Sequence, residues 1–377
     1  MSEPVERVLF LTHELSFRGS SILLLRLAQG LEARGVEAIV LCTRNQKLDA
    51  GLTDGVRIIR VPGYTVPGWG RVVRRTVLRN LSEQPPDVIH VHGPRMLAQG
   101  LWLGRTLDRP VVVTLTDQTE AARVVLSSPS SYCRAIVCVS ESVRVALPPR
   151  LDQLEQRVIL PGVSLDSTTN IPTILQDDQV PVIGIAGPLE VIKGGSFFLR
   201  ACHRVLDTGT LIRIVVVGSG PEEKNLRRLA TSLELDDHIT FVDDGTSMSA
   251  YLTAIDIFCL PSLQQGFGVI MLEAMALGRP AIASGVGGVL SILEDGVNGF
   301  VVPPSDSRAL ADRMLELLKN RELASRIAIA GQNLVEDKFT KERMVDEILA
   351  LYSDITESPS SAVTVPVEQA VATSNEG

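Results

Sequence analysis

The chain has 377 residues, of which 45% are hydrophobic and 21% charged, and this apolar content is enough for the cores of two domains of ordinary size. No segment approaches the roughly 18 uninterrupted apolar residues that a membrane-spanning helix needs. The N-terminal residues are acidic where a secretory signal would be basic. The five cysteines have neither the pattern of a disulfide framework nor the spacing of a metal site. We therefore expect a cytoplasmic protein with reduced thiols and no metal.

The net charge of −8 is unevenly distributed. Residues 1–165 carry 20 basic and 15 acidic side chains, whereas residues 166–377 carry 16 basic and 29 acidic ones. The acidic second half argues against broad nucleic-acid binding, and the mildly basic first half is compatible with an anionic ligand or surface. Lysine is scarce, with 6 Lys among 36 basic residues. A lysine in a candidate site is therefore informative.

The first half of the sequence predicts a parallel sheet covered by helices. An apolar strand at 8–11 precedes a helix whose apolar positions run from Ile22 to Leu31, and Gly35 is placed to end that helix. Strand–helix–strand units of this length give parallel pairs with a crossover helix. Strands that are apolar throughout belong to sheets covered on both faces. Further strands of this kind are expected at 36–41, 88–91, 111–114 and 135–138.

After a polar stretch at about 164–180, which we interpret as a linker, the same plan restarts. Strands are expected at 182–186, 212–217, 239–242, 257–260 and 281–283, and helices at 196–205, 306–319, 322–334 and 340–353. The sequence thus predicts an α/β protein with two doubly wound, Rossmann-like domains, residues 1–165 and residues 166–339. In such folds ligands bind beyond the carboxyl ends of the strands, so the cleft between the domains is the expected site.

The segment 260–280 carries the strongest chemical signal. A strand ends at Leu260, a glycine-bracketed turn follows, and a helix starts near Val269. The amides of Phe267, Gly268 and Val269 would be unpaired at that helix start, which favours a phosphate. Glu273 lies one turn further along and could accept hydrogen bonds from two ribose hydroxyls. A phosphate site beside a ribose-binding carboxylate predicts that this segment binds a nucleotide.

Residues 260–303 resemble the signature of the family 4 retaining glycosyltransferases, which have the GT-B fold. Five other short sequence motifs match that family in their order and spacing along the chain, at 87–92, 139–142, 160–163, 187–194 and 217–221. The resemblance extends to about residue 354. It implies an acceptor-side N-terminal domain, a donor-side C-terminal domain, and a last helix, 340–354, that crosses back onto the N-terminal domain. We expect the remainder, 355–377, to be a disordered tail because it is rich in Ser, Thr, Val and Pro.

The resemblance also implies roles for individual residues. Lys193 and the amides of residues 267–269 would stabilise a departing diphosphate, and Glu273 would hold the ribose. Gln265 would contact the sugar and is, with Lys193, a candidate catalytic residue. The other candidates are Gly187, Gly266 and Gly19 on the donor side, and Thr116, Asp117 and His92 on the sugar and acceptor side. Simpler interpretations remain open for Lys193 (a solvated lysine), Gly19 (an ordinary turn) and His92 (a satisfied strand-end histidine).

Four positions depart from the family pattern. Gln265 replaces the first acid of a pair of glutamates eight residues apart, and Pro188 replaces an arginine. Thr116 replaces a histidine ahead of Asp117, and Ser291 replaces an acid after the double glycine. Pro188 removes the group best shaped to hold a diphosphate in a bidentate way, so Lys193 becomes the main candidate cation.

Residues 69–81 predict a basic amphipathic helix in which Arg71, Arg75 and Arg79 share one face. A solvated face over a packed helix is the simpler interpretation. The alternative is peripheral contact with an anionic membrane or a phosphorylated acceptor.

From the sequence we expect a metal-independent retaining glycosyltransferase, possessing no cofactor, that transfers a sugar from a nucleoside-diphosphate sugar of the UDP or GDP type. Its acceptor would be a glycan, a lipid or another small molecule, and no nucleic-acid partner is expected. The alternative is a catalytically degenerate GT-B homologue that binds a nucleotide or glycan as a partner subunit. The substitutions at Pro188, Thr116 and Gln265 are the basis of that alternative.

Overall fold

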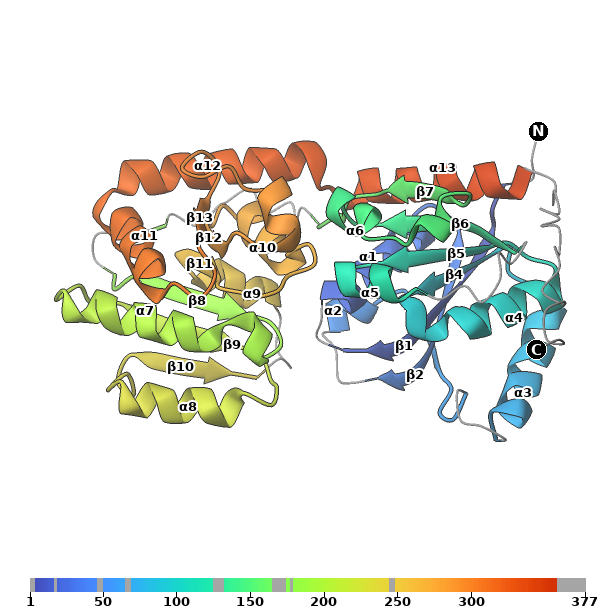
Figure 1. Ribbon diagram of the computed structural model, residues 1–377, viewed down its shortest axis with the longest axis horizontal. Helices are drawn as coiled ribbons and strands as arrows, with labels where there is room; N and C mark the ends of the chain where they lie inside the picture. The colour runs from blue at the N-terminus through green and yellow to red at the C-terminus, as the bar shows by residue number, and fades with distance from the viewer. Residues whose placement is uncertain are drawn as a thin grey trace, which may run out of the picture.

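The computed structural model describes residues 4–357 except 17–18, 46–49, 65–68, 125–131, 165–173, 177–178 and 244–247. Two α/β domains lie side by side along the long axis of the molecule, each built on one parallel sheet with helices on both faces (Figure 1). Within the described residues no helix is long and apolar enough to cross a membrane.

The N-terminal domain contains a seven-stranded parallel sheet in the order β3-β2-β1-β4-β5-β6-β7. The four strands at its centre are almost wholly buried because helices cover both faces. The strands are β1 (Arg7–Leu15), β2 (Glu37–Asn45), β3 (Arg57–Arg60), β4 (Val88–His92), β5 (Val111–Leu115), β6 (Cys133–Cys138) and β7 (Glu155–Val158). The helices are α1 (Gly19–Glu32), α2 (Ala50–Thr53), α3 (Trp69–Glu83), α4 (Leu97–Leu107), α5 (Gln118–Arg123) and α6 (Glu141–Val145).

The C-terminal domain repeats this plan with a six-stranded parallel sheet in the order β10-β9-β8-β11-β12-β13. The strands are β8 (Val182–Ala186), β9 (Arg213–Val217), β10 (Ile239–Val242), β11 (Ile257–Leu260), β12 (Ala281–Ser284) and β13 (Phe300–Val302). The helices are α7 (Gly195–Asp207), α8 (Glu223–Ser232), α9 (Met248–Ala254), α10 (Val269–Ala276), α11 (Ser307–Lys319) and α12 (Arg321–Lys338). The fold class expected from the sequence, two doubly wound Rossmann-like domains, is therefore confirmed.

Both sheets reverse their strand order at one point, between β1 and β4 and between β8 and β11. At such a switch point the loops that leave neighbouring strands diverge, and ligands bind beyond the carboxyl ends of those strands. Three sequence candidates follow these strands directly: His92 ends β4, Lys193 follows β8, and Gln265 follows β11. The topology thus accounts for the clustering of candidates at one edge of each sheet.

The last helix, α13 (Lys341–Glu357), lies along the N-terminal domain although the preceding helix, α12, belongs to the other domain (Figure 1). Gly162 makes the crossing possible, since a Cβ at this position would lie 2.5 Å from the carbonyl oxygen of Thr340. Tyr352 is fully buried and its hydroxyl lies 2.5 Å from Nδ1 of His90 on β4. The helix begins one residue later and ends three residues later than the expected range 340–354. The rest of the expected tail, residues 358–377, and most of the expected linker lie outside the described residues.

The two domains touch at the switch-point edges. A Cβ on Gly266 would lie 2.4 Å from the carbonyl oxygen of Thr116, so the loop after β11 packs directly against the loop after β5. Gly19, at the start of α1, faces Val269 at the start of α10, and a Cβ on Gly19 would lie 3.5 Å from the Cβ of Val269. The glycine at 266 therefore allows backbone from the two domains to approach closely.

Candidate active site

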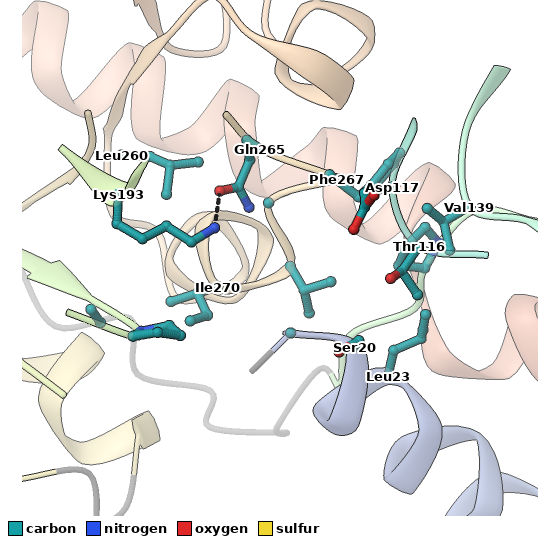
Figure 2. Close-up of a pocket in the computed structure, with 17 residues that line it drawn as sticks. Ser20, Leu23, Thr116, Asp117, Val139, Lys193, Leu260, Gln265, Phe267 and Ile270 are labelled. Atoms are coloured by element: carbon teal, nitrogen blue, oxygen red, sulfur yellow. Dashed lines mark hydrogen bonds between the residues drawn. The ribbon is translucent and has the colours of Figure 1, made fainter. Parts of the chain in front are cut away.

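A cavity of about 150 Å³ lies between the domains at this contact (Figure 2). It takes its walls from the start of α1, the β5–α5 loop, the turn after β8 and the β11–α10 loop. The sequence candidates among its lining residues are Gly19, Thr116, Asp117, Lys193, Gln265, Gly266, Phe267, Gly268 and Val269. Nine of the candidate residues, from four separate segments, thus meet at one place.

The floor of the cavity is the N-terminus of α10, a helix that is buried from Val269 to Met275. Gly268 caps it in the left-handed conformation, with φ 86°, which a residue with a side chain rarely adopts. Within the described residues, the amides of Phe267, Gly268 and Val269 donate to no other group. These amides and the helix dipole make the end of α10 suitable for an anion such as a phosphate.

Lys193 reaches the cavity from a short 3-10 turn after β8. This turn packs against the β11–α10 loop: the amide of Leu263 donates to Ile192, and Gly194 lies so close to Pro261 that a Cβ would be 1.9 Å from its carbonyl oxygen. The Lys193 ammonium donates to Oε1 of Gln265 at 2.8 Å (Figure 2). A cation therefore lines the same cavity as the free amides of α10.

The opposite wall is formed by Thr116 and Asp117 (Figure 2). Asp117 caps α5 by accepting from the amide of Glu120, and Glu120 accepts from both the amide and the hydroxyl of Thr116 at 2.8 and 2.9 Å. Burial raises the pKa of Glu120, and its hydrogen bond from the Thr116 backbone opposes that shift. The Thr116 hydroxyl proton is thus directed at Glu120, which leaves its oxygen lone pairs to accept from a ligand.

Glu273 lies in a neighbouring cavity of about 250 Å³ rather than in the first one. Its carboxylate forms an ion pair at 2.7 Å with Arg26 of α1, so the pair joins the two domains. Both side chains are only 10% exposed. Gly19 and Val269, where the domains touch, line the first cavity, and Arg26 and Glu273 lie on the same two helices further along.

Two further candidates lie outside the first cavity. Gly187 lines a small adjoining pocket, which Lys193 also lines. His92 is buried at the end of β4, and burial lowers its pKa to about 4, so its ring is neutral at pH 7. Within the described residues no group of three or more His, Cys, Asp or Glu side chains is arranged to hold a metal ion.

Two family models match the chain. Residues 17–167 match glycosyltransferase family 4, and residues 180–320 match the glycosyl transferases group 1. The two matches coincide with the two halves of the fold and together include every residue of the first cavity. The chain belongs to the family 4, or group 1, glycosyltransferases of the GT-B fold.

Three proteins of similar sequence are glycosyltransferases by name. The phosphatidyl-myo-inositol mannosyltransferase of Mycobacterium leprae is 29% identical over 89% of this chain and 93% of its own length. The D-inositol 3-phosphate glycosyltransferase of Xylanimonas cellulosilytica is 24% identical over 90% of this chain and 92% of its own. The O-antigen chain mannosyltransferase C of Escherichia coli is 27% identical over 73% of this chain and 77% of its own.

Solved glycosyltransferase structures share the fold. The Anabaena protein HepE, in complex with UDP and glucose, superimposes with a TM-score of 0.77 over 93% of this chain and 100% of its own, at 20% identity. WaaG, a glycosyltransferase involved in lipopolysaccharide biosynthesis, gives a TM-score of 0.69 over 92% of this chain and 99% of its own, at 16% identity. These neighbours confirm the GT-B architecture of this glycosyltransferase.

Three residues at or near the site of this glycosyltransferase were not among the candidates predicted from the sequence: Ser262, Glu120 and Arg26. Ser262 is buried and donates to Oε1 of Gln265 at 3.1 Å, a contact its place three residues earlier could have suggested. Glu120 follows Asp117 by three residues, which is the spacing of a capping box, and that signal was available. Arg26 gave no local signal, because its partner Glu273 is more than 240 positions away.

Proposed function

We propose that this glycosyltransferase is a retaining enzyme that takes its sugar from a UDP or GDP sugar without the help of a metal ion. One observation carries the proposal: Lys193 and the free amides that begin α10 line the same cavity. A diphosphate carries charge that a cation and amide donors together can balance. The Anabaena structures that contain UDP and UDP-glucose support a nucleotide-sugar donor for this fold.

In the proposed reaction the bond between the anomeric carbon and the diphosphate oxygen breaks, and a bond to an acceptor oxygen forms on the same face of the sugar. Lys193 and the α10 amides stabilise the charge that develops on the departing diphosphate. An oxygen of that diphosphate takes the proton that the acceptor hydroxyl loses. Gln265 and the pair Thr116–Asp117 contact the sugar from opposite walls. For Glu273 to hold the ribose, the nucleotide has to extend from the first cavity into the neighbouring one and take the place of Arg26 at the carboxylate.

The proposed acceptor is a glycan or a glycolipid. The names of the Mycobacterium leprae and Escherichia coli relatives refer to a phosphatidylinositol and to an O-antigen chain, so lipid-linked acceptors occur among proteins of similar sequence. On this protein, α3 carries exposed Arg75 and Arg79 and provides a cationic surface for an anionic acceptor or membrane. The side chain of Arg71, the third arginine of that face, lies outside the described residues.

The proposal is tested by thermal unfolding with a panel of nucleoside diphosphates in the presence of a chelator. UDP or GDP should raise the melting temperature, because a ligand that binds only the folded state stabilises it by mass action. Glu273→Ala should abolish most of the shift. If no nucleoside diphosphate at millimolar concentration stabilises the wild-type protein, the proposed donor site is wrong.

The alternative, a degenerate homologue that acts as a nucleotide- or glycan-binding subunit, is favoured by Thr116, whose hydroxyl is engaged by Glu120, and by Pro188 in the cavity wall. It predicts nucleotide binding without release of nucleotide from any donor sugar. The triple variant Pro188→Arg, Thr116→His, Gln265→Glu should then create activity. Turnover by the wild-type protein would exclude this alternative.

A further inference from the structure

The orientation of the Gln265 amide is fixed by chemistry. The ammonium of Lys193 can only donate hydrogen bonds, so the amide atom 2.8 Å from it is the oxygen, Oε1. The hydroxyl of Ser262 donates to the same oxygen at 3.1 Å. Two donors thus converge on Oε1, and rotating the amide by 180° would set its nitrogen against the ammonium. The Gln265 amide therefore has one stable orientation.

This orientation makes position 265 a donor toward the cavity. Gln265 lines the cavity, and because its Oε1 accepts from Lys193 (Figure 2) and Ser262, its amide nitrogen is the atom left to contact a ligand there. Within the described residues Nε2 of Gln265 donates to no other group. A glutamate with the same contacts would instead present an acceptor oxygen to a ligand. The substitution thus reverses the hydrogen-bonding polarity of this wall, in addition to removing a charge.

We propose that Gln265 determines donor specificity by selecting a sugar that presents an acceptor-only oxygen to it, the carboxylate of a uronic acid or the carbonyl of an acetamido group. This inference rests on the proposed function. A carboxylate is the stronger acceptor, because hydrogen bonds to charged groups are about twice as strong as neutral ones. It also gains from the ammonium of Lys193, which is hydrogen-bonded to the same amide.

The opposite wall accepts hydrogen bonds from the sugar. Thr116 directs its proton at Glu120, and Asp117 contributes a carboxylate to the lining. Hydroxyl groups of the sugar can donate to that wall while an acceptor-only group faces Gln265 and Lys193. The cavity therefore has a donor wall from the C-terminal domain and an acceptor wall from the N-terminal domain, which also fixes the direction in which a sugar enters.

The experiment compares the affinity of the whole protein for UDP, UDP-glucose, UDP-glucuronic acid and UDP-N-acetylglucosamine by calorimetry. If GDP rather than UDP stabilises the protein, the comparison uses GDP, GDP-mannose and GDP-mannuronic acid instead of the UDP compounds. We expect the acid or the acetamido sugar to bind about tenfold more tightly than the neutral sugar, because a sugar hydroxyl is a weaker acceptor for the amide than a carboxylate or a carbonyl oxygen. Whichever of the two sugars binds more tightly identifies the group that Gln265 selects, the carboxylate or the acetamido carbonyl.

Gln265→Glu should remove this preference and favour the neutral sugar, while affinity for UDP alone changes much less. Gln264→Glu is the matched control, because it adds the same charge at an exposed neighbouring position and should keep the wild-type preference. Equal or tighter binding of the neutral sugar by the wild-type protein would overturn the inference. An equal loss of affinity for UDP and for the UDP-sugars in Gln265→Glu would also overturn it, because it would show that the amide contacts the diphosphate rather than the sugar. Failure of every nucleotide to bind would overturn the proposed function itself.

Discussion

Lys193 is the only basic residue among the described residues that line the cavity between the domains. Since Pro188 occupies the position where the family pattern has an arginine, one ammonium has to balance most of the diphosphate charge. Its contact with Gln265 holds it in place before a ligand arrives. A preorganised charge of this kind acts mainly on the transition state, where the leaving group carries more charge than in the bound donor.

Lys193→Ala should therefore lower turnover by roughly a hundredfold or more, and nucleotide affinity by much less. The measurement is the release of nucleotide from a matched donor, alongside the dissociation constant for the free nucleotide. Lys224→Ala, at an exposed position on α8, is the control and should leave both unchanged. Turnover that is indifferent to Lys193→Ala would show that the leaving group binds elsewhere.

At the level of single residues, the sequence predicted those features of the site that lie within one continuous segment of the chain. The strand, glycine turn and helix of 260–273 lie in one continuous segment, so the unpaired amides of α10 could be inferred from their order. The Lys193–Gln265 contact joins two such segments and was not predicted as a bond. The pairing of Glu273 with Arg26 depends on how two domains approach each other, and no local pattern encodes that distance.

At the level of elements, α13 is attached to the N-terminal sheet through a buried polar network. Nδ1 of His90 on β4 lies 2.5 Å from the Tyr352 hydroxyl, and Nε2 lies 2.6 Å from the hydroxyl of Thr114 on β5. Burial, with a smaller contribution from His92, lowers the pKa of His90 to about 3. The ring is neutral in the folded protein, and the network links two strands and the crossing helix.

This network should make folding stability depend on pH. The unfolded chain binds a proton at His90 near pH 6.5 and the folded protein only near pH 3, so stability is lost as the pH falls below 6.5. At pH 5 the loss from His90 alone is about 2 kcal/mol relative to pH 7. Chemical denaturation at the two pH values measures it. His90→Gln should reduce the difference, whereas His203→Gln, a partly exposed position on α7, should not. An undiminished pH dependence in His90→Gln would contradict the assignment.

The α3 helix allows a test of the cationic surface. If its arginines contact anionic lipid, the protein should float with anionic liposomes at low salt and be released as the salt concentration rises. Replacing Arg71, Arg75 and Arg79 by glutamine should weaken flotation without changing nucleotide binding. Equal flotation of variant and wild-type protein would support the simpler interpretation of a solvated face.

The strands that the sequence missed are edge strands of the two sheets. The strands β3, β7 and β13 contain three or four residues each, and β3 and β7 are half-buried or exposed. The polar residues of β3 and β7 interrupt the continuous apolar pattern that predicted the central strands, because an edge strand is covered on fewer sides. The strand β13 is apolar but only three residues long, which is too short for a pattern to predict it. The central strands, by contrast, were found because burial on both faces restricts them to apolar residues.

At the level of the whole molecule, the contacts between the two domains among the described residues include a close backbone approach at Gly266, shared apolar packing and a buried ion pair. Arg26 and Glu273 lie on the facing helices α1 and α10, each only 10% exposed, at 2.7 Å. Removing Arg26 takes away the cation that faces the buried Glu273 carboxylate, and breaking a buried ion pair in this way typically costs about 3–5 kcal/mol. Opening the cleft lets water reach that charge, so the loss of Arg26 should favour an open form.

Arg26→Ala should therefore increase the radius of gyration of the ligand-free protein, measured by small-angle X-ray scattering. The double variant Arg26→Met, Glu273→Leu removes both charges and fills the space with apolar groups, so it should remain as compact as the wild-type protein. Arg34→Ala is the control, since Arg34 pairs with Asp346 at the surface and within one domain. If Arg26→Ala stays compact, the other contacts between the domains are enough to keep the cleft closed. If the double variant opens as well, the size of the arginine rather than its charge keeps the cleft closed.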